Sequence, residues 1–312
     1  MKTLKNIIIL FLFSLLFFNC NNRNVAVLDT PTSGNTKIGV DETLLPVIKS
    51  EIDVFEATYD KAKIHSTYCS ERDLFNLFFQ DSVKMIVASR ELNKREKAYL
   101  KSVKQYPNLT LIAIDAIAII VNKQNNDSLI SVNTLKNIVS GEIVSWKKIN
   151  KESNLDKIKL VFDNPSSSTV RYIFDSVCMK QLFSKKHIAL KCNSDVIKYV
   201  SNNPNAIGII GLSWISDKED TVTQSNLKKV RLVSVSEQKV ATCLNSYKPY
   251  QSCISNNDYP LCRNIYIINK EPRLGLASGL TTFIAGEKGQ KIILKSGIVP
   301  SKAIVRMVQI ND

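Results

Sequence analysis

Short runs of β-branched and apolar residues alternate with helix-like stretches along most of the chain, and this alternation restricts the fold more than any other feature. Strands are predicted at residues 36–40, 63–66 and 82–88, and helices between and after them at 44–57, 71–79 and 92–103. Such an order is typical of α/β proteins whose sheets are largely parallel. The sequence therefore predicts an α/β fold.

The most apolar run, residues 109–121, is long enough for a strand that crosses between two lobes. After it we expect helices at 132–140, 276–285 and 288–296, one that begins within 166–169, and strands at 159–163, 206–211 and 264–268. A further helix is predicted to end near Val200, with Asn193, Ser194 or Asp195 as its N-cap. The roughly 270 residues that follow residue 35 suggest two domain-sized units.

The N-terminus indicates export. Lys2 and Lys5 precede an apolar run at residues 7–18, which is too short for a membrane span and is typical of a signal peptide. Cys20 closes this run and is the expected lipidation site, so residues 1–19 form a signal peptide and 20–35 a lipidated flexible tether. The alternative is an ordinary signal peptide with a chance cysteine. We expect a lipid-anchored protein of the bacterial cell envelope, facing the periplasm or the cell surface.

Charge and cysteine content narrow the function classes further. A net charge of +14 could indicate nucleic-acid binding, but an exported protein rarely meets nucleic acid, and the lysines are scattered.

Without Cys20 an even number of cysteines remains, which permits disulfides between Cys178 and Cys192 and between Cys243 and Cys253. Free thiols are an equal alternative. The absence of a C-x-x-C pair argues against a metal site, and we expect no cofactor.

The segment DNPSSSTVR, residues 163–171, is the strongest candidate for a ligand site. Ser167, Ser168 and Thr169 place hydroxyl groups at a predicted helix N-terminus, where unpaired N–H groups and the helix dipole favour an oxyanion. The simpler interpretation is that one serine caps the helix, which is worth ~1 kcal/mol. Catalysis is not expected, because the two histidines, His65 and His187, are not next to a nucleophile in sequence and the common catalytic motifs are absent.

Several strings in order along the chain carry a resemblance to a known family. They are VASREL (87–92), DAIAIIVN (115–122), SGEIVSW (140–146), AIGIIGL (206–212), YPLCR (259–263) and GEKGQKIILKSGIVP (286–300). Together they resemble the phosphate ABC transporter substrate-binding family, which has the type II periplasmic-binding-protein fold. The resemblance implies two lobes, each a mixed and mostly parallel sheet flanked by helices, with a ligand cleft between them. Lobe one would comprise residues 36–112 and 263–312, and lobe two residues 113–262.

The resemblance also suggests which residues line the cleft, and where this chain differs from the family. Ser167, Ser168 and Thr169 resemble the family's Ser-Gly-Thr turn, with Ser168 in place of glycine. Asp163 stands where the family often has a basic residue four positions before that turn. Arg90, next to Ser89, stands where one subset has an acid. The two changes resemble an exchange of charge, so we expect Arg90 to clamp the anion while Asp163, with Arg171 nearby, orients it.

The first loop differs more strongly, because Asp41 and Glu42 replace the family's small hydroxyl pair and leave only Thr43. A carboxylate about 4 Å from a bound anion would cost about 4 kcal/mol at an effective dielectric of about 20. If Asp41 and Glu42 face the cleft, divalent phosphate is a poor ligand. If they face outward, phosphate is compatible with the loop.

The resemblance implies an exported solute-binding lipoprotein that captures a small oxyanion, phosphate first, for uptake through an ABC transporter permease. The expected ligand set is Thr43, Ser89, Arg90, Ser167, Ser168 and Thr169. The alternative is a related lipoprotein whose ligand has changed or been lost and which acts in signalling, assembly or surface interaction. Neither interpretation includes an enzyme, a metal or a nucleic-acid partner.

Overall fold

The computed structural model describes residues 29–180 and 187–302. The predicted signal peptide, Cys20, the tether up to residue 28 and residues 303–312 lie outside these ranges. Within them, no helix is both long and apolar enough to cross a membrane.

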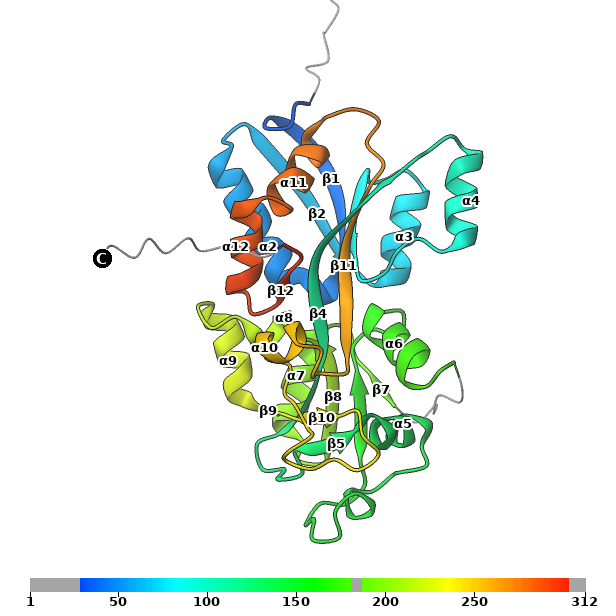
Figure 1. The fold of residues 1–312 in the computed structure, drawn as a ribbon, viewed down its shortest axis with the longest axis vertical. Coiled ribbons are helices and arrows are strands. Elements are labelled where there is room, and N and C mark those ends of the chain that lie inside the picture. The colour runs from blue at the N-terminus through cyan, green and yellow to red at the C-terminus, as the bar shows by residue number, and fades with distance from the viewer. Residues whose placement is uncertain (1–28, 181–186, 303–312) are drawn as a thin grey trace, which may run out of the picture.

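Two groups of secondary structure are stacked along the long axis of the molecule, and the chain passes between them more than once (Figure 1). The upper group contains the strands β1 (Gly34–Asp41), β2 (Ala62–Cys69), β3 (Met85–Ala88) and β12 (Val299–Pro300), with helices α2 (Leu45–Thr58), α3 (Glu71–Phe79), α4 (Lys94–Ser102), α11 (Leu276–Ile284) and α12 (Glu287–Lys295). A 3-10 turn, Glu42–Leu44, links β1 to α2. We call this group lobe one.

Lobe two contains β5 (Leu129–Ser131), β6 (Lys159–Phe162), β7 (Ile188–Ala189), β8 (Ala206–Gly211), β9 (Val230–Leu232) and β10 (Ser234–Ser236). Its helices are α5 (Val132–Ser140), α6 (Ser168–Tyr172), α7 (Asn193–Asn202), α8 (Ser213–Ser216), α9 (Thr221–Lys229) and α10 (Gln251–Ser255). A short 3-10 turn covers Trp146–Lys148, and a π-helical turn, Ile173–Val177, continues α6.

Two long strands, β4 (Asn108–Asn122) and β11 (Cys262–Asn269), join the lobes. The first part of β4 pairs antiparallel with β11 and β12, and its second part pairs antiparallel with β8 and β9. Hydrogen bonding is therefore continuous from one lobe to the other in the order β2-β1-β3-β11-β4-β8-β6-β7. The apolar run of residues 109–121 does form the expected crossing strand, and β4 belongs to the sheets of both lobes.

In the large sheet, parallel pairing is confined to the outer parts, and β5 and β10 form a separate parallel pair. β1 pairs parallel with β2 and β3, and β6 pairs parallel with β7 and β8, whereas the crossing strands pair antiparallel. The predicted α/β architecture with mixed, mostly parallel sheets is confirmed. The carboxyl ends of parallel strands lie at the same edge of a sheet. The loops that follow β1 and β3 in lobe one, and the loop that follows β6 in lobe two, lie at the boundary between the lobes (Figure 1).

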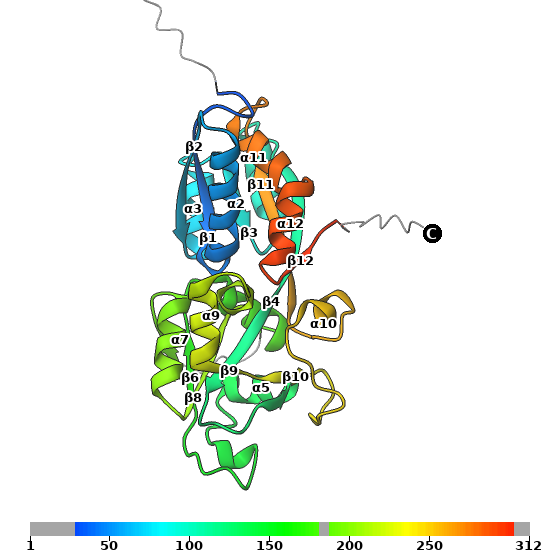
Figure 2. The same ribbon diagram turned by 90° about the vertical axis from the view of Figure 1, so that its left-hand side faces the viewer.

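Helices cover both faces of the lobe-one sheet (Figure 2). One face packs against α2, α11 and α12 and is part of a hydrophobic core that continues into lobe two. The other face packs against α3 and α4 in a separate cluster that contains Leu74, Phe78, Ile86 and Leu100. Burial on two faces explains why the strands read as continuous apolar runs.

Three sequence-based expectations need correction or completion. The N-cap of α7 is Cys192, not Asn193, Ser194 or Asp195, because Asn193 is already the first helical residue and its side chain bonds elsewhere. The sequence did not predict β5, β7, α8, α9, β9, β10 or α10, which are short elements without a clear period. The six cysteines that the structure describes are free thiols, so neither of the compatible bridges forms.

Candidate functional site

A buried ion pair lies where the crossing strands meet. Arg263 of β11 is the cross-strand neighbour of Asp115 of β4, and its Nε and Nη2 atoms lie 3.0 and 2.9 Å from Asp115 Oδ2. Burial alone would lower the pKa of Arg263, but the charges of Asp115 and Asp41 and the hydrogen bonding to Asp115 together outweigh burial, so the pKa is raised. Burial raises the pKa of Asp115, and Arg263 offsets part of that shift. The register of two strands thus fixes a charged guanidinium between the lobes.

Arg263 donates to one hydroxyl group from each lobe. Its Nη2 lies 2.9 Å from Thr43 Oγ1 in the loop after β1, and its Nη1 lies 2.9 Å from Ser168 Oγ at the start of α6. The two hydroxyl oxygens are themselves 3.3 Å apart. All three side chains are buried. We call Arg263, Thr43, Ser168 and Asp115 the buried centre.

The last residue of β1, Asp41, brings an acidic side chain into this centre. Asp41 is buried, and its Oδ1 accepts hydrogen bonds from the backbone N–H and the hydroxyl of Thr43. Its other oxygen, Oδ2, is buried without a hydrogen-bond partner, as is Oδ1 of Asp115. Buried acceptors without a donor are unusual in native proteins, so this centre offers two acceptor positions to a ligand that can donate.

The backbone of the loop after β1 touches lobe two directly. Ser213 Oγ donates to the Thr43 carbonyl oxygen at 2.8 Å. Gly211 ends β8 beside that carbonyl, and a Cβ atom at position 211 would lie only 2.8 Å from the carbonyl oxygen. A glycine at this position therefore permits the observed approach of the two lobes.

In the turn before α6, the side chain of Asp163 gathers two hydroxyl groups. Ser167 Oγ donates to Asp163 Oδ1 at 2.5 Å and caps the helix by accepting from Val170 N, and Thr169 Oγ1 donates to Asp163 Oδ2 at 3.3 Å. Among the three hydroxyl residues of the turn, Ser168 is the one that bonds to Arg263. Ser167 and Thr169 bond to Asp163 instead.

Asn193 connects two further carboxyl groups across the cleft. Its Nδ2 donates to Glu42 Oε2 at 2.6 Å and to Asp163 Oδ2 at 3.1 Å, and its Oδ1 accepts from Gly211 N.

Burial raises the pKa of Glu42 to about 7, partly offset by the hydrogen bond from Asn193. Burial likewise raises the pKa of Asp163 to about 7, against the hydrogen bond from Ser167. Asp41 and Glu42 both face the cleft, which settles the orientation that the sequence left open.

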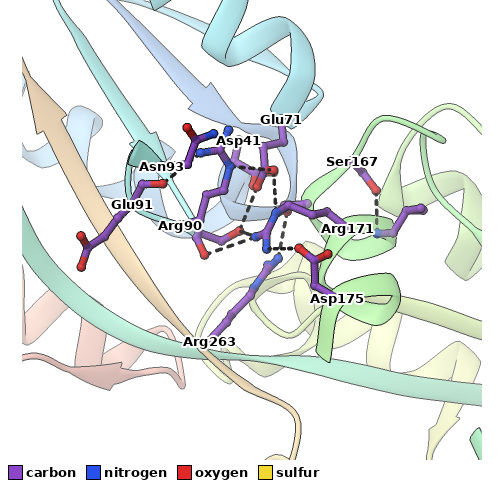
Figure 3. A network of polar contacts seen from close by, with 12 residues as sticks. Asp41, Glu71, Arg90, Glu91, Asn93, Ser167, Arg171, Asp175 and Arg263 are labelled. Carbon is purple, nitrogen blue, oxygen red and sulfur yellow. Dashed lines mark hydrogen bonds and ion pairs between the residues drawn. The ribbon is translucent and has the colours of Figure 1, made fainter. Parts of the chain in front are cut away.

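A second polar network lies outside the buried centre (Figure 3). Arg171 of α6 places Nε 2.6 Å from Glu71 Oε1 of α3, and its Nη2 donates to Ser89 Oγ at 3.2 Å. Arg90 lies against the same Glu71 and forms a bidentate pair with Glu96 at 2.8 and 2.9 Å. This network also joins the lobes, because Arg171 comes from lobe two and its partners from lobe one.

The structure thus divides the predicted site residues into two groups. Thr43 and Ser168 meet in the buried centre, with Asp41, Glu42, Asp163, Ser167 and Thr169 around them. Ser89, Arg90 and Arg171 belong to the outer network, where every nitrogen of the Arg90 guanidinium already has an acceptor. Sequence reasoning missed the roles of Arg263, Asp115 and Asn193. The sequence did contain a signal for Asp115, because a charged residue inside the apolar run of β4 needs a buried partner.

No group of three or more histidine, cysteine, aspartate or glutamate residues in the described ranges is arranged to hold a metal ion. The donors in the centre are a guanidinium, hydroxyls and an amide, and the acceptors are carboxylates. Such a set binds small polar solutes by hydrogen bonding.

Two lobes joined by crossing strands, with convergent polar groups buried between them, define a solute-binding protein of the two-lobed class. Comparison with known proteins agrees with this class: residues 26–285 match the PBP superfamily domain, that of the periplasmic binding proteins. The chain belongs to this superfamily.

Individual relatives are similar over nearly the whole chain. The phosphate-binding protein PstS of Borreliella burgdorferi is 25% identical over 309 residues, which cover 96% of this chain and 99% of that protein. PstS of Staphylococcus aureus strain RF122 is 25% identical over 307 residues, 96% of this chain and 88% of that protein. An ABC-type phosphate transport receptor from Vibrio cholerae has the same fold, with a TM-score of 0.63 and 19% identity over 86% of this chain and 100% of that one.

Proposed function

We propose that this protein captures phosphate in the buried centre, without changing it chemically, as the solute-binding component of an uptake system. The observation that carries this proposal is Arg263, a buried guanidinium that donates at 2.9 Å to Thr43 of one lobe and at 2.9 Å to Ser168 of the other. A ligand between the two hydroxyls would replace their direct contact and accept from Arg263 and Ser168, and from Thr43 once its hydroxyl proton turns from Asp41 Oδ1 to the ligand. Relatives named as phosphate-binding proteins support the choice of ligand.

The carboxyl groups around the centre favour a protonated oxyanion. Asp41 Oδ2 and Asp115 Oδ1 are acceptors without donors, and phosphate near neutral pH carries one or two protons that it can donate to them, whereas sulfate at neutral pH carries none. Because the pKa values of Glu42 and Asp163 are about 7, these groups are partly neutral at physiological pH. The repulsion that two ionised carboxylates would exert on the anion is reduced accordingly.

Closure of the lobes at the crossing strands supplies the binding motion. Arg263 and Asp115 lie on β11 and β4, next to the segments at 113–118 and 261–264 that we propose as hinges. The hydroxyl groups of Thr43 and Ser168 lie on either side of these hinges. A ligand that contacts both groups binds the closed arrangement better than the open one, and therefore shifts the equilibrium toward it.

The proposal extends to the cell envelope. We propose that Cys20 carries a lipid that anchors the mature chain to a membrane of the bacterial cell envelope, where it delivers phosphate to an ABC transporter permease. Support comes from the apolar run before Cys20 and from the superfamily match. Mass spectrometry of the mature N-terminus tests the anchor, and an unmodified Cys20 or cleavage elsewhere would contradict it.

One observation favours the alternative of a changed ligand. Four carboxyl groups, those of Asp41, Glu42, Asp115 and Asp163, surround a single guanidinium. If they remain ionised together, the centre repels anions, and a neutral or cationic solute would fit better. A thermal-shift screen with oxyanions, amino acids and cations separates the two functions, because a ligand that binds only the folded protein stabilises it by RT ln(1 + [L]/Kd).

Calorimetric titration with phosphate, arsenate and sulfate tests the proposal directly. We expect phosphate and arsenate to bind and sulfate to bind much more weakly. Thr43→Val and Ser168→Ala each remove one hydroxyl group next to Arg263, and each should weaken phosphate binding by about tenfold or more, since hydrogen bonds to charged groups are worth ~1.5–3 kcal/mol. Ser166→Ala, in the same turn but outside the centre, is the matched control.

The same titration distinguishes the two arginines. The sequence suggested Arg90 as the anion clamp, whereas the contacts favour Arg263. Arg90→Ala should therefore leave phosphate affinity within a few-fold of the unmodified protein. A tenfold loss in Arg90→Ala would restore the sequence-based assignment, and no binding of phosphate at millimolar concentration would refute the proposed function.

A further inference from the structure

Large apolar and aromatic side chains are exposed where the chain passes from the end of α4 to the start of β4. Tyr106, Leu109 and Leu111 are between 38% and 71% exposed. Single exposed apolar residues are common on protein surfaces, but a group of them beside a groove indicates an interaction surface.

The strand pairing explains why these side chains are uncovered. Leu109 and Leu111 pair with Ile268 and Tyr266 of β11, so they lie on the sheet face that packs against α3 and α4. Among the described residues, β4 pairs only with β11 over positions 108–111, and it is therefore the edge strand of lobe one there. The apolar face of the sheet extends beyond the helices that cover it.

A groove of about 360 Å³ lies at this edge. It is lined by five apolar or aromatic residues, among them Tyr106 and Leu109, and by Lys97, Lys101 and Gln105. Apolar groups and lysines therefore belong to one continuous surface. We define the α4–β4 surface as Lys97, Lys101, Lys104, Tyr106, Leu109 and Leu111.

The α4–β4 surface is basic. Residues 94–111 contain five basic residues and a single acidic one, which is already paired. Lys97 pairs with Glu91, whereas in the part of the chain that the structure describes neither Lys101 nor Lys104 forms an ion pair. Both lysines are exposed. The surface thus presents positive charge without matching negative charge.

This combination fits a membrane that contains anionic lipids better than it fits a protein partner. Lysines near such a membrane are attracted to the headgroups, and tyrosine and leucine side chains enter the boundary between headgroups and acyl chains. Protein–protein interfaces, by contrast, are depleted of lysine.

The α4–β4 surface lies at the end of lobe one that is remote from the buried centre. Asn108 pairs with Asn269 at that end of the crossing strands, β1 begins there at Gly34, and α4 forms the outer edge of the lobe (Figure 1). Eight residues separate Cys20 from Asp29, the first described residue, and a fully extended chain of that length spans at most roughly 30 Å. A lipid on Cys20 would keep this end of lobe one close to the membrane.

We propose that the α4–β4 surface docks onto the headgroup region of a membrane that contains anionic phospholipids. The inference rests on the proposed lipid anchor, which brings the membrane within reach, and it adds a contact made by the folded domain itself. Docking by this end leaves the boundary between the lobes, at the opposite end of lobe one, accessible to solute.

Sedimentation with lipid vesicles tests the inference on the mature chain with Cys20→Ser, which cannot carry the lipid. We expect binding to vesicles of equal parts phosphatidylglycerol and phosphatidylcholine, and much weaker binding to phosphatidylcholine alone. Lys101→Gln combined with Lys104→Gln should lower the partition coefficient about tenfold or more, since each lysine near an anionic surface contributes about fivefold. Tyr106→Ser should lower it about fivefold, because less apolar area leaves water.

The matched controls are exposed residues of lobe two. Lys147→Gln combined with Lys151→Gln removes the same charge, and Tyr250→Ser removes the same ring. These variants should bind vesicles as the unaltered surface does. Equal losses in the controls and in the α4–β4 variants would overturn the inference, because the overall charge of +14 would then account for the binding.

Two other results would also overturn the inference. One is the absence of binding to the anionic vesicles. The other is a dimer, seen in sedimentation velocity without vesicle binding, that Tyr106→Ser dissociates, since a second copy of the chain would then cover the surface. Phosphate titration and mass spectrometry of Cys20 are independent of the vesicle assay, so the inference and the proposed function can fail separately.

Discussion

Glu51 is a carboxyl group that the fold buries at a cost in stability. It lies on the core-facing side of α2 among Ile48, Ile52 and Phe55, and it is completely buried. Neither of its carboxyl oxygens has a hydrogen-bond partner. Burial raises the pKa of Glu51 from 4.5 to about 9. Glu51 is therefore protonated and neutral in the folded protein at pH 7, whereas in the unfolded chain it is ionised.

The sign and size of the effect follow from these two pKa values. Below pH 4.5 the carboxyl group is protonated in both states, so it does not alter stability through ionisation. Between pH 4.5 and about 9 only the unfolded chain releases the proton, which favours unfolding by ~1.4 kcal/mol for each pH unit. At pH 7 the accumulated cost is about 3 kcal/mol. Replacing Glu51 with glutamine, which has nearly the same shape and cannot ionise, should remove that cost.

Glu51→Gln should therefore raise the free energy of unfolding by about 3 kcal/mol at pH 7 and have little effect at pH 4. Thermal unfolding followed by circular dichroism should show an increase of roughly 6–12 °C at pH 7, at ~2–4 °C per kcal/mol. Glu152→Gln, on the exposed surface of lobe two, is the control and should change neither value. A gain that is equal at both pH values, or no gain at pH 7, would refute the argument.

Two further predictions concern the cleft. Phosphate affinity should fall about tenfold or more between pH 6 and pH 8 as Glu42 and Asp163, with pKa values of about 7, ionise beside the anion. Glu42→Gln should flatten this profile in calorimetric titrations, and an unchanged profile would count against the site. Gly211→Ala places a methyl group 2.8 Å from the Thr43 carbonyl oxygen, so it should hold the lobes apart and weaken phosphate binding. X-ray scattering would show a larger radius of gyration, and an unaltered radius would contradict the steric argument.

The sequence predicted those parts of the fold that have a strong local pattern. Residues 109–121 are apolar except for Thr110 and Asp115, because β4 is buried over most of its length, and the run identified the crossing strand. The helix at Glu71–Phe79 was predicted with the bounds that the structure shows. Between Ser213 and Ser255 the elements are short, and their residues alternate little in polarity, so local periodicity could not reveal them.

The candidate site was predicted only where its residues are neighbours in sequence. Ser167, Ser168 and Thr169 form one local cluster, and the hydroxyl groups were recognisable from their position before a helix. Arg263 and Asp115 are separated by 148 residues, and they meet because β11 and β4 pair in one particular register. No local pattern in a single sequence reports such a pairing, although both residues lie inside strings that carried the family resemblance.

In the proposed function, the position of Arg263 links the charge of the site to the closure of the lobes. A guanidinium on one lobe alone could bind an anion in the open state, but Arg263 lies on a crossing strand and donates to Thr43 and Ser168 from opposite lobes. Its pairing with Asp115 holds it there, and removal of either partner would leave an unpaired buried charge, at a cost of ~3–5 kcal/mol. In the proposed function Arg263 would therefore contribute to closure as well as to binding, because its hydrogen bonds to both lobes are complete only when the lobes are together.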